Sequence, residues 1–255
     1  MHTYTNMTWP DDPYRTGQQL YRRPVPRLAA FAARPAAPGD RLVPSGVAMV
    51  YLPLHRTQAM SVTEQTLTFG FRAASAGDPA DLAALATVAD LDLMQARRHA
   101  AVLAGHLLAG DLAALRQAGD AAALRGLAAV EHEWAARGKA AGRAATFDCG
   151  LDLPGTPSLE LACQQAGIAA GSGADEADGR EAAMLAVERA LMIALVCARH
   201  QGRYNWAETL RIGPVLAAAT WDCLPQPATD TAAPTSHTVA QSGIRAGAAS
   251  PGNLK

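Results

Sequence analysis

Lysine is scarce in this chain of 255 residues: two of its 22 basic residues are lysines, Lys139 and Lys255, and the others are arginines. Alanine is the commonest residue. This combination is typical of a GC-rich bacterial genome, so we expect most arginines to be solvated surface charges. The scarcity of lysine therefore reflects coding bias and excludes no class of function.

The common phosphate-binding and hydrolase motifs are missing. The chain has no GxxxxGK[ST], GxSxG, HExxH, CxxC or dinucleotide-type glycine motif. Its glycine-dense stretch, 167–173, lacks a lysine and a preceding strand, which indicates a flexible linker. These absences favour a non-enzymatic protein, and they leave the catalytic residues of any enzyme unknown.

Long hydrophobic runs and export signals are missing as well. The longest strongly apolar run, 190–198, has about half the length that a membrane-spanning helix needs. The first ten residues do not combine a cationic stretch with an apolar one. The four cysteines lie far apart, so we expect free thiols. The sequence thus predicts a cytoplasmic protein with no membrane partner.

Proline content divides the chain into three parts. Seven prolines in residues 1–45 predict an extended arm rich in proline and arginine. Residues 223–255 consist largely of Pro, Thr, Ser, Gly and Ala without an apolar period, which predicts a disordered tail. The remaining residues, 46–222, have the length of one domain with a single core.

Within that domain the hydrophobic pattern is mostly helical. Two short apolar segments, 46–52 and 66–71, predict a small β-hairpin at 46–72. Asp78 has the character of an N-cap, and apolar residues then recur with a helical period. The helices predicted in this way span 78–109, 111–117, 120–138, 156–166, 175–201 and 206–220. The predicted fold is mainly α (all-alpha), a bundle of five or six helices with a small N-terminal hairpin.

Cys197 and His200 form the best candidate for a metal site. Three residues apart on a helix, the thiol and the imidazole lean to the same side, and both are zinc ligands. Cys223, together with Cys149 or Cys163, could complete the site. Cys197 also suits a core position, and His200 suits the end of a helix. No cofactor is the leading expectation, and zinc is the alternative.

Two histidines share one face of the predicted 78–109 helix. His99 and His106 are seven residues apart, and His106 lies between apolar positions. Such a pair could join an acidic group from another helix in a shared site. A histidine held inside the fold by a hydrogen bond is the plainer interpretation.

Aromatic residues gather in the predicted arm. Aromatic and arginine side chains dominate binding hot spots, and prolines hold a segment extended for docking. The arm therefore predicts binding to a protein partner or to a second copy of the chain, although it could also wrap its own domain. The residues expected to make this contact are Tyr4, Trp9, Tyr14, Tyr21, Arg22 and Arg23.

Charge separates the remaining hypotheses. Residues 46–222 hold 14 basic and 19 acidic side chains, an unsuitable surface for nucleic acid. The leading hypothesis is a bacterial accessory protein that acts through protein–protein contacts. The alternative is a small helical metal-binding protein or enzyme that uses Cys197 and His200. A third option is nucleic-acid contact through Arg22, Arg23 and Arg27 of the arm.

Overall fold

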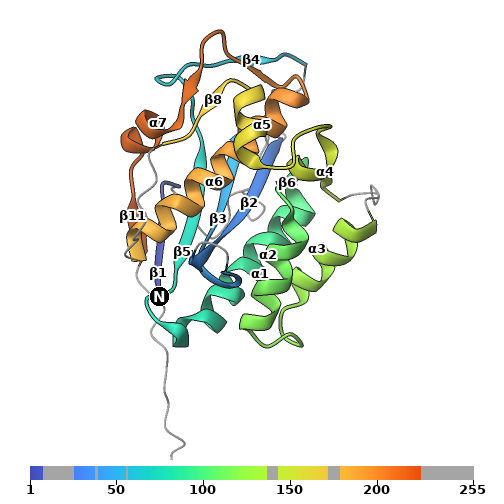
Figure 1. Cartoon of the computed structure of the whole chain (residues 1–255), viewed down its shortest axis with the longest axis vertical. Helices are drawn as coiled ribbons and strands as arrows, with labels where there is room; N and C mark the ends of the chain where they lie inside the picture. The colour runs from blue at the N-terminus through green and yellow to red at the C-terminus, as the bar shows by residue number, and fades with distance from the viewer. Residues whose placement is uncertain (8–25, 38–39, 56, 137–142, 172–178, 225–255) are drawn as a thin grey trace, which may run out of the picture.

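The computed structural model of the chain describes residues 1–7, 26–37, 40–55, 57–136, 143–171 and 179–224. In these residues a mixed β-sheet of seven strands lies between two groups of helices (Figure 1). The strands are β1 (His2–Thr5), β2 (Arg27–Ala37), β3 (Asp40–Pro53), β4 (Met60–Ser61), β5 (Gly70–Ser75), β6 (Val102–Gly105), β7 (Ala145–Asp148), β8 (Ile168–Ala169), β9 (Tyr204–Asn205), β10 (Leu210–Arg211) and β11 (Asp222–Leu224). The helices are η1 (Pro79–Asp81), α1 (Leu82–His99), α2 (Leu108–Ala118), α3 (Arg125–Ala136), α4 (Cys149–Asp152), α5 (Leu159–Gln165), α6 (Gly179–His200) and α7 (Ile212–Ala218).

The strand order in the large sheet is β11-β1-β5-β3-β2-β6-β7. The pairs from β11 to β2 are antiparallel, whereas β2, β6 and β7 run parallel to one another. The strand order therefore reverses between β2 and β6, because the chain leaves β2 toward β3 on one side and leaves β6 toward β7 on the other. Two short pairs, β8 with β10 and β4 with β9, lie outside this sheet.

The prediction of a mainly α, all-alpha bundle is wrong, because the large mixed sheet organises the fold. Much of the predicted arm belongs to that sheet, as β1, β2 and the first part of β3. Both faces of β2 are covered: Leu28 and Ala30 face the core beside α6, and Ala29 and Phe31 face the core beside α1–α3. A strand that is buried on both faces has a continuous apolar run in place of an alternating pattern. For this reason β2 was not predicted from the sequence.

Two of the prolines that suggested an arm, Pro35 and Pro44, lie where the strand pairing is irregular. Pro35 in β2 faces Pro44 in β3, and the pairing register shifts on both sides of Pro35. Proline lacks the N–H that a regular ladder needs, so it is tolerated at such irregularities. The expected strand at 46–52 forms part of β3, which pairs with β5.

The helix predicted over 78–109 is interrupted by a strand. Asp78 is an N-cap as predicted, since its side chain accepts the N–H of Ala80, but α1 ends at His99. β6 follows, with all four residues buried and parallel to β2. Alanine and leucine occur in both helices and buried strands. The apolar spacing of the predicted helix therefore continued through residues 102–105, which form β6.

Helix α6 crosses one face of the sheet and forms the centre of the core there (Figure 1). Leu191 and Leu195 are completely buried, as predicted from the apolar stretch around them. The helix lies close to β3: a Cβ atom on Gly46 would be 2.9 Å from the carbonyl oxygen of Ala182. A glycine at this position permits the close approach of strand and helix.

The last helix is shorter than the predicted 206–220. Residues 206–211 form a loop and β10, and α7 begins at Ile212, which leaves Pro214 in its first turn. Proline is tolerated there because the first helical N–H groups have no partner within the helix. The tail predicted over 223–255 lies outside the described residues, apart from Cys223 and Leu224, which belong to β11.

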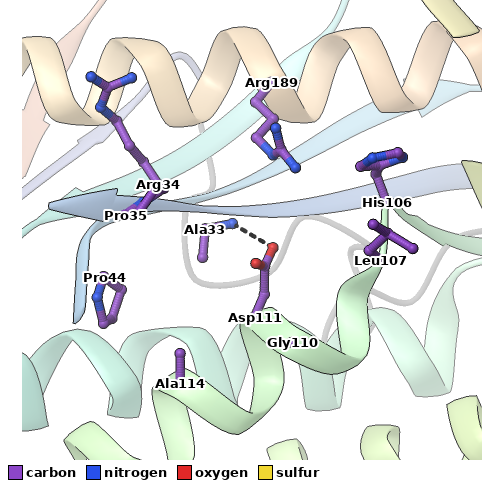
Figure 2. A pocket seen from close by; sticks show the side chains of 10 residues that line it. All are labelled: Ala33, Arg34, Pro35, Pro44, His106, Leu107, Gly110, Asp111, Ala114 and Arg189. Atoms are coloured by element: carbon purple, nitrogen blue, oxygen red, sulfur yellow. Dashed lines mark hydrogen bonds between the residues drawn. The ribbon is translucent and has the colours of Figure 1, made fainter. Parts of the chain in front are cut away.

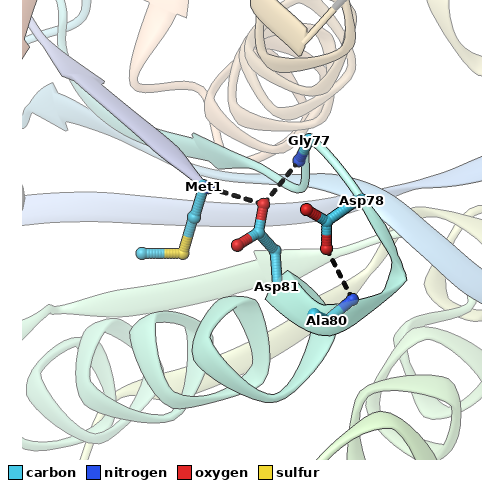
Figure 3. A network of polar contacts seen from close by, with 5 residues as sticks. All are labelled: Met1, Gly77, Asp78, Ala80 and Asp81. Atoms are coloured by element: carbon cyan, nitrogen blue, oxygen red, sulfur yellow. Dashed lines mark hydrogen bonds and ion pairs between the residues drawn. The ribbon is translucent and has the colours of Figure 1, made fainter. Parts of the chain in front are cut away.

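The chain start is fastened to the beginning of the first helical segment (Figure 3). The amino nitrogen of Met1 lies 2.5 Å from Oδ2 of Asp81, and the same oxygen accepts the N–H of Gly77 at 2.8 Å. The hydrogen bond from the amino group, followed by the one from Gly77, lowers the pKa of Asp81. These contacts connect β1 to the segment that precedes α1.

A buried ion pair connects β5 with α1. Nη1 of Arg72 lies 3.2 Å from Oδ1 of Asp92, whose side chain is 9% exposed. Burial raises the pKa of Asp92 to about 6, against the opposing effect of the Arg72 charge and its hydrogen bond. The loss of hydration therefore outweighs the attraction at this position.

This pKa shift predicts a loss of stability as the pH rises. The folded protein holds a proton on Asp92 more tightly than the unfolded chain does, so the contribution of Asp92 to the free energy of unfolding should fall between about pH 4 and pH 6. The expected fall is on the order of 2–3 kcal/mol. Urea unfolding at several pH values would measure the free energy of unfolding. Between about pH 4 and pH 6 it should fall more in the wild type than in Asp92→Asn. The control Asp120→Asn, which replaces an exposed carboxylate, should show the same pH dependence as the wild type. Parallel curves for the wild type and Asp92→Asn would contradict the prediction.

Candidate functional site

Polar side chains follow the buried parts of the three parallel strands. Arg34 follows the buried run of β2, His106 follows β6 directly, and Asp148 is the last residue of β7. The carboxyl ends of parallel strands meet at one edge of a sheet, and open α/β sheets bind ligands at this edge where the strand order reverses. The order reverses here between β2 and β6, so this edge is the candidate position for a ligand site.

A cavity of about 280 Å³ lies at this edge, between α6 on one side and α2 on the other (Figure 2). We call it the strand-end pocket. Its lining residues come from β2, β3, the β6–α2 connection, α2 and α6: Ala33, Arg34, Pro35, Pro44, His106, Leu107, Gly110, Asp111, Ala114 and Arg189.

Two arginines from different elements line the strand-end pocket. Arg34 continues the alternation of β2 that turns Ala30 and Ala32 toward α6, and its side chain rises toward that helix (Figure 2). Arg189 extends from α6 toward β2 (Figure 2). Its Nε atom is buried and has no hydrogen-bond partner among the described residues. Neither guanidinium forms an ion pair with another described residue, so the pocket contains two cationic groups that no carboxylate of the described residues contacts directly.

The acidic groups nearby compensate this charge only in part. Asp111, in the first turn of α2, accepts the N–H of Ala33 at 3.3 Å. Glu160 of α5 is exposed and close enough to interact electrostatically with Arg189 and His106. The pKa of Glu160 is lowered, first by a backbone hydrogen bond, then by the Ser158 side chain and by these two neighbouring residues. Among the lining residues, two arginines stand against a single carboxylate.

Asp148 holds the β6–α2 connection in place. Its carboxylate is 1% exposed and accepts the N–H groups of Leu107 at 2.9 Å and Leu108 at 3.4 Å. It also accepts the indole N–H of Trp134 at 3.0 Å and the N–H of Gly150 at 2.9 Å. Leu107 has φ 51° and ψ 41°, the left-handed conformation that a leucine rarely adopts. The hydrogen bonds of Asp148 thus stabilise a strained residue that shapes the strand-end pocket.

The structure does not bring the predicted metal ligands together. Cys197 is fully buried in α6, and burial, with a smaller effect of Cys149, raises the pKa of its thiol. His200 ends the same helix, with its ring 5.3 Å from that of Phe147, and Cys223 is an exposed residue of β11. Within the described ranges, no three His, Cys, Asp or Glu side chains are grouped so that they could hold a metal ion. The zinc alternative stays a prediction.

Of the residues predicted to bind a partner, only Tyr4 lies in the described part of the chain. Its side chain is buried in β1, and its ring packs edge-on against Trp221 with 6.2 Å between centroids. Trp9, Tyr14, Tyr21, Arg22 and Arg23 lie outside the described residues, so their contact with a partner stays a prediction. None of the described helices is long and apolar enough to cross a membrane.

No family model matches this chain, and no curated protein or solved structure matches it. The geometry of the strand-end pocket is therefore the main indication of function. Arg34 and Arg189 were not candidates in the sequence, because nothing distinguishes them from other arginines in an arginine-rich chain. The signal that could have found Arg34 is its place directly after an apolar run of strand length, once that run is read as a buried parallel strand.

Proposed function

We propose that this protein binds an anionic group in the strand-end pocket. The observation that carries the proposal is the presence of Arg34 and Arg189 in one cavity, without an ion-pair partner among the described residues. Guanidinium groups are the preferred partners of phosphate and carboxylate oxygens, because they offer several N–H donors in a fixed plane. An anion would supply the hydrogen bonds and the charge that these two side chains lack.

The position of the cavity supports the same function. It lies where the strand order of the sheet reverses, at the carboxyl ends of β2 and β6, which is the usual ligand position in open α/β sheets. The first turn of α2 also borders it through Gly110 and Asp111. Ligand binding without an assigned reaction also fits the accessory role predicted from the sequence.

Anion titration of the wild type and two arginine variants tests the proposal. Inorganic phosphate should bind saturably, and Arg34→Gln or Arg189→Gln should each weaken binding by about tenfold or more, since a charge-assisted hydrogen bond contributes about 1.5–3 kcal/mol. Isothermal titration calorimetry would measure the affinities. Arg180→Gln is the matched control: it makes the same change in charge at an exposed position of α6.

The control separates a defined site from general charge attraction. Binding that Arg180→Gln weakens as much as Arg189→Gln would show that net charge alone attracts the anion, and the proposal would then be wrong. It would also be wrong if every phosphate and carboxylate probe bound equally well to the wild type and to both pocket variants. Unfolding curves of each variant would establish that a lost affinity does not reflect a lost fold.

A further inference from the structure

We propose further, on the basis of that function, that the ligand is a phosphate monoester whose organic group lies against Pro35 and Pro44. The strand-end pocket combines two separate features: arginines on its α6 side, and an apolar wall from β2, β3 and the β6–α2 region. The first feature defines the head group, and the second defines what the head group is attached to.

The arrangement of the arginines favours a tetrahedral head group over a planar one. A carboxylate has two oxygens in one plane, and one bidentate guanidinium engages both of them from one edge. Arg34 comes from a strand and Arg189 from the helix that crosses it, so the two guanidiniums approach the cavity from different elements (Figure 2). A phosphate monoester has three terminal oxygens directed away from one another, which suits donors that come from different elements. Its charge of about −1.5 to −2 at neutral pH also matches two arginines better than a single negative charge does.

The apolar wall indicates an organic group beside the phosphate. Pro35 and Pro44 face each other across β2 and β3, and Pro44 is buried. The other apolar lining residues are Ala33, Leu107 and Ala114. A cavity of 280 Å³ has the volume of roughly nine water molecules in the liquid, more than an inorganic ion fills. This volume is just below the range for small-molecule sites, about 300–1,000 Å³, so the organic group is small.

Four probe molecules that differ in their charged group or in their phenyl ring test this inference. Phenyl phosphate has the proposed head group and a ring, inorganic phosphate has the head group alone, benzoate has the ring with a carboxylate, and methyl phenyl phosphate is the corresponding diester. Calorimetric titration of the wild type should give phenyl phosphate the highest affinity, about tenfold above each of the other three. Arg34→Gln and Arg189→Gln should reduce that affinity, whereas Arg180→Gln should leave it unchanged.

A variant at Gly110 tests the place of the organic group. Gly110 lines the cavity, and a Cβ atom there would meet no other atom within 4 Å, so a larger side chain can enter open space. Gly110→Leu should weaken phenyl phosphate about tenfold and leave inorganic phosphate unchanged, because both arginines remain. Gly110→Ala, which adds one carbon, is the matched control and should bind both probes like the wild type.

The outcomes distinguish this inference from the proposed function. If benzoate, the diester or inorganic phosphate bound as tightly as phenyl phosphate, in a manner that still depends on Arg34 and Arg189, the inference would be overturned while the anion site stood. Equal effects of Gly110→Leu on phenyl phosphate and on inorganic phosphate would also overturn it. If none of the four probes bound in an arginine-dependent manner, the proposed function itself would fail.

Discussion

Replacing Leu191 with alanine is expected to lower the free energy of unfolding by about 2–5 kcal/mol. Leu191 is completely buried in α6, in the core cluster that lies against β2 and β3. Truncation removes apolar contacts and leaves a cavity that the surrounding sheet and helix cannot close, because protein interiors are packed at the density of organic crystals. Leu195, also completely buried in α6, should respond in the same way.

A leucine at the surface provides the control. Leu151 of α4 is 60% exposed, so the same substitution there should change the free energy of unfolding by no more than about 0.5 kcal/mol. Denaturation in urea, monitored by circular dichroism, would measure all three variants. A loss below about 1 kcal/mol for both Leu191→Ala and Leu195→Ala would show that α6 is not the centre of the core.

Replacing Asp148 with alanine should destabilise the protein by about 3–5 kcal/mol. The carboxylate accepts hydrogen bonds from three backbone N–H groups and from the indole of Trp134. Alanine would leave these donors without an acceptor in an interior where water cannot easily replace it. The left-handed backbone at Leu107 would also lose the contact that stabilises it.

Asparagine at the same position separates charge and acceptor geometry from volume. Asp148→Asn keeps the size of the side chain, but its NH₂ group replaces one of the two oxygens that now accept hydrogen bonds. Two donors would then face another donor, so Asp148→Asn should cost more than half of the stability that Asp148→Ala costs. Asp120→Ala is the control for a surface aspartate that accepts a backbone N–H within a turn, that of Ala122, and it should cost about 0.5–1.5 kcal/mol. If Asp148→Ala cost no more than Asp120→Ala, Asp148 would not hold the β6–α2 connection as we infer.

Asp148→Ala should also alter the strand-end pocket. His106 and Leu107 line it, and their backbone conformation depends on the Asp148 carboxylate. Asp148 thus contributes to the pocket as a positioning residue. Its loss should weaken phosphate binding even though its carboxylate is not among the lining groups.

The sequence by itself determined several elements from local chemistry. The helical period and the terminal charges of 175–201 predicted α6, and the fully apolar middle of that segment predicted its burial. Asp78 was predicted as an N-cap because its side chain bonds a nearby backbone N–H, an interaction that requires no distant partner. The strand at 46–52 followed from its β-branched and aromatic residues.

Only the tertiary structure decided whether the ambiguous alanine- and leucine-rich segments became strands or helices. Residues 27–33 and 102–105 have no alternating pattern, because both faces of β2 and β6 are covered by helices. A segment of this kind becomes a strand when neighbouring strands accept its backbone hydrogen bonds, and the neighbours of β2 come from β3 and β6. β3 follows β2 directly in the chain, whereas β6 lies more than 60 positions further along, so the pairing with β6 cannot be read from the residues near β2.

The candidate site was decided in the same way. Arg34 and Arg189 are more than 150 positions apart in the sequence, and each alone has the character of a surface charge. They line one cavity because β2 is central in the sheet and α6 crosses it, an arrangement created by the burial of apolar residues elsewhere. Local chemistry therefore determined the cap at Asp78 and the burial of α6, whereas long-range pairing decided which charges share a pocket.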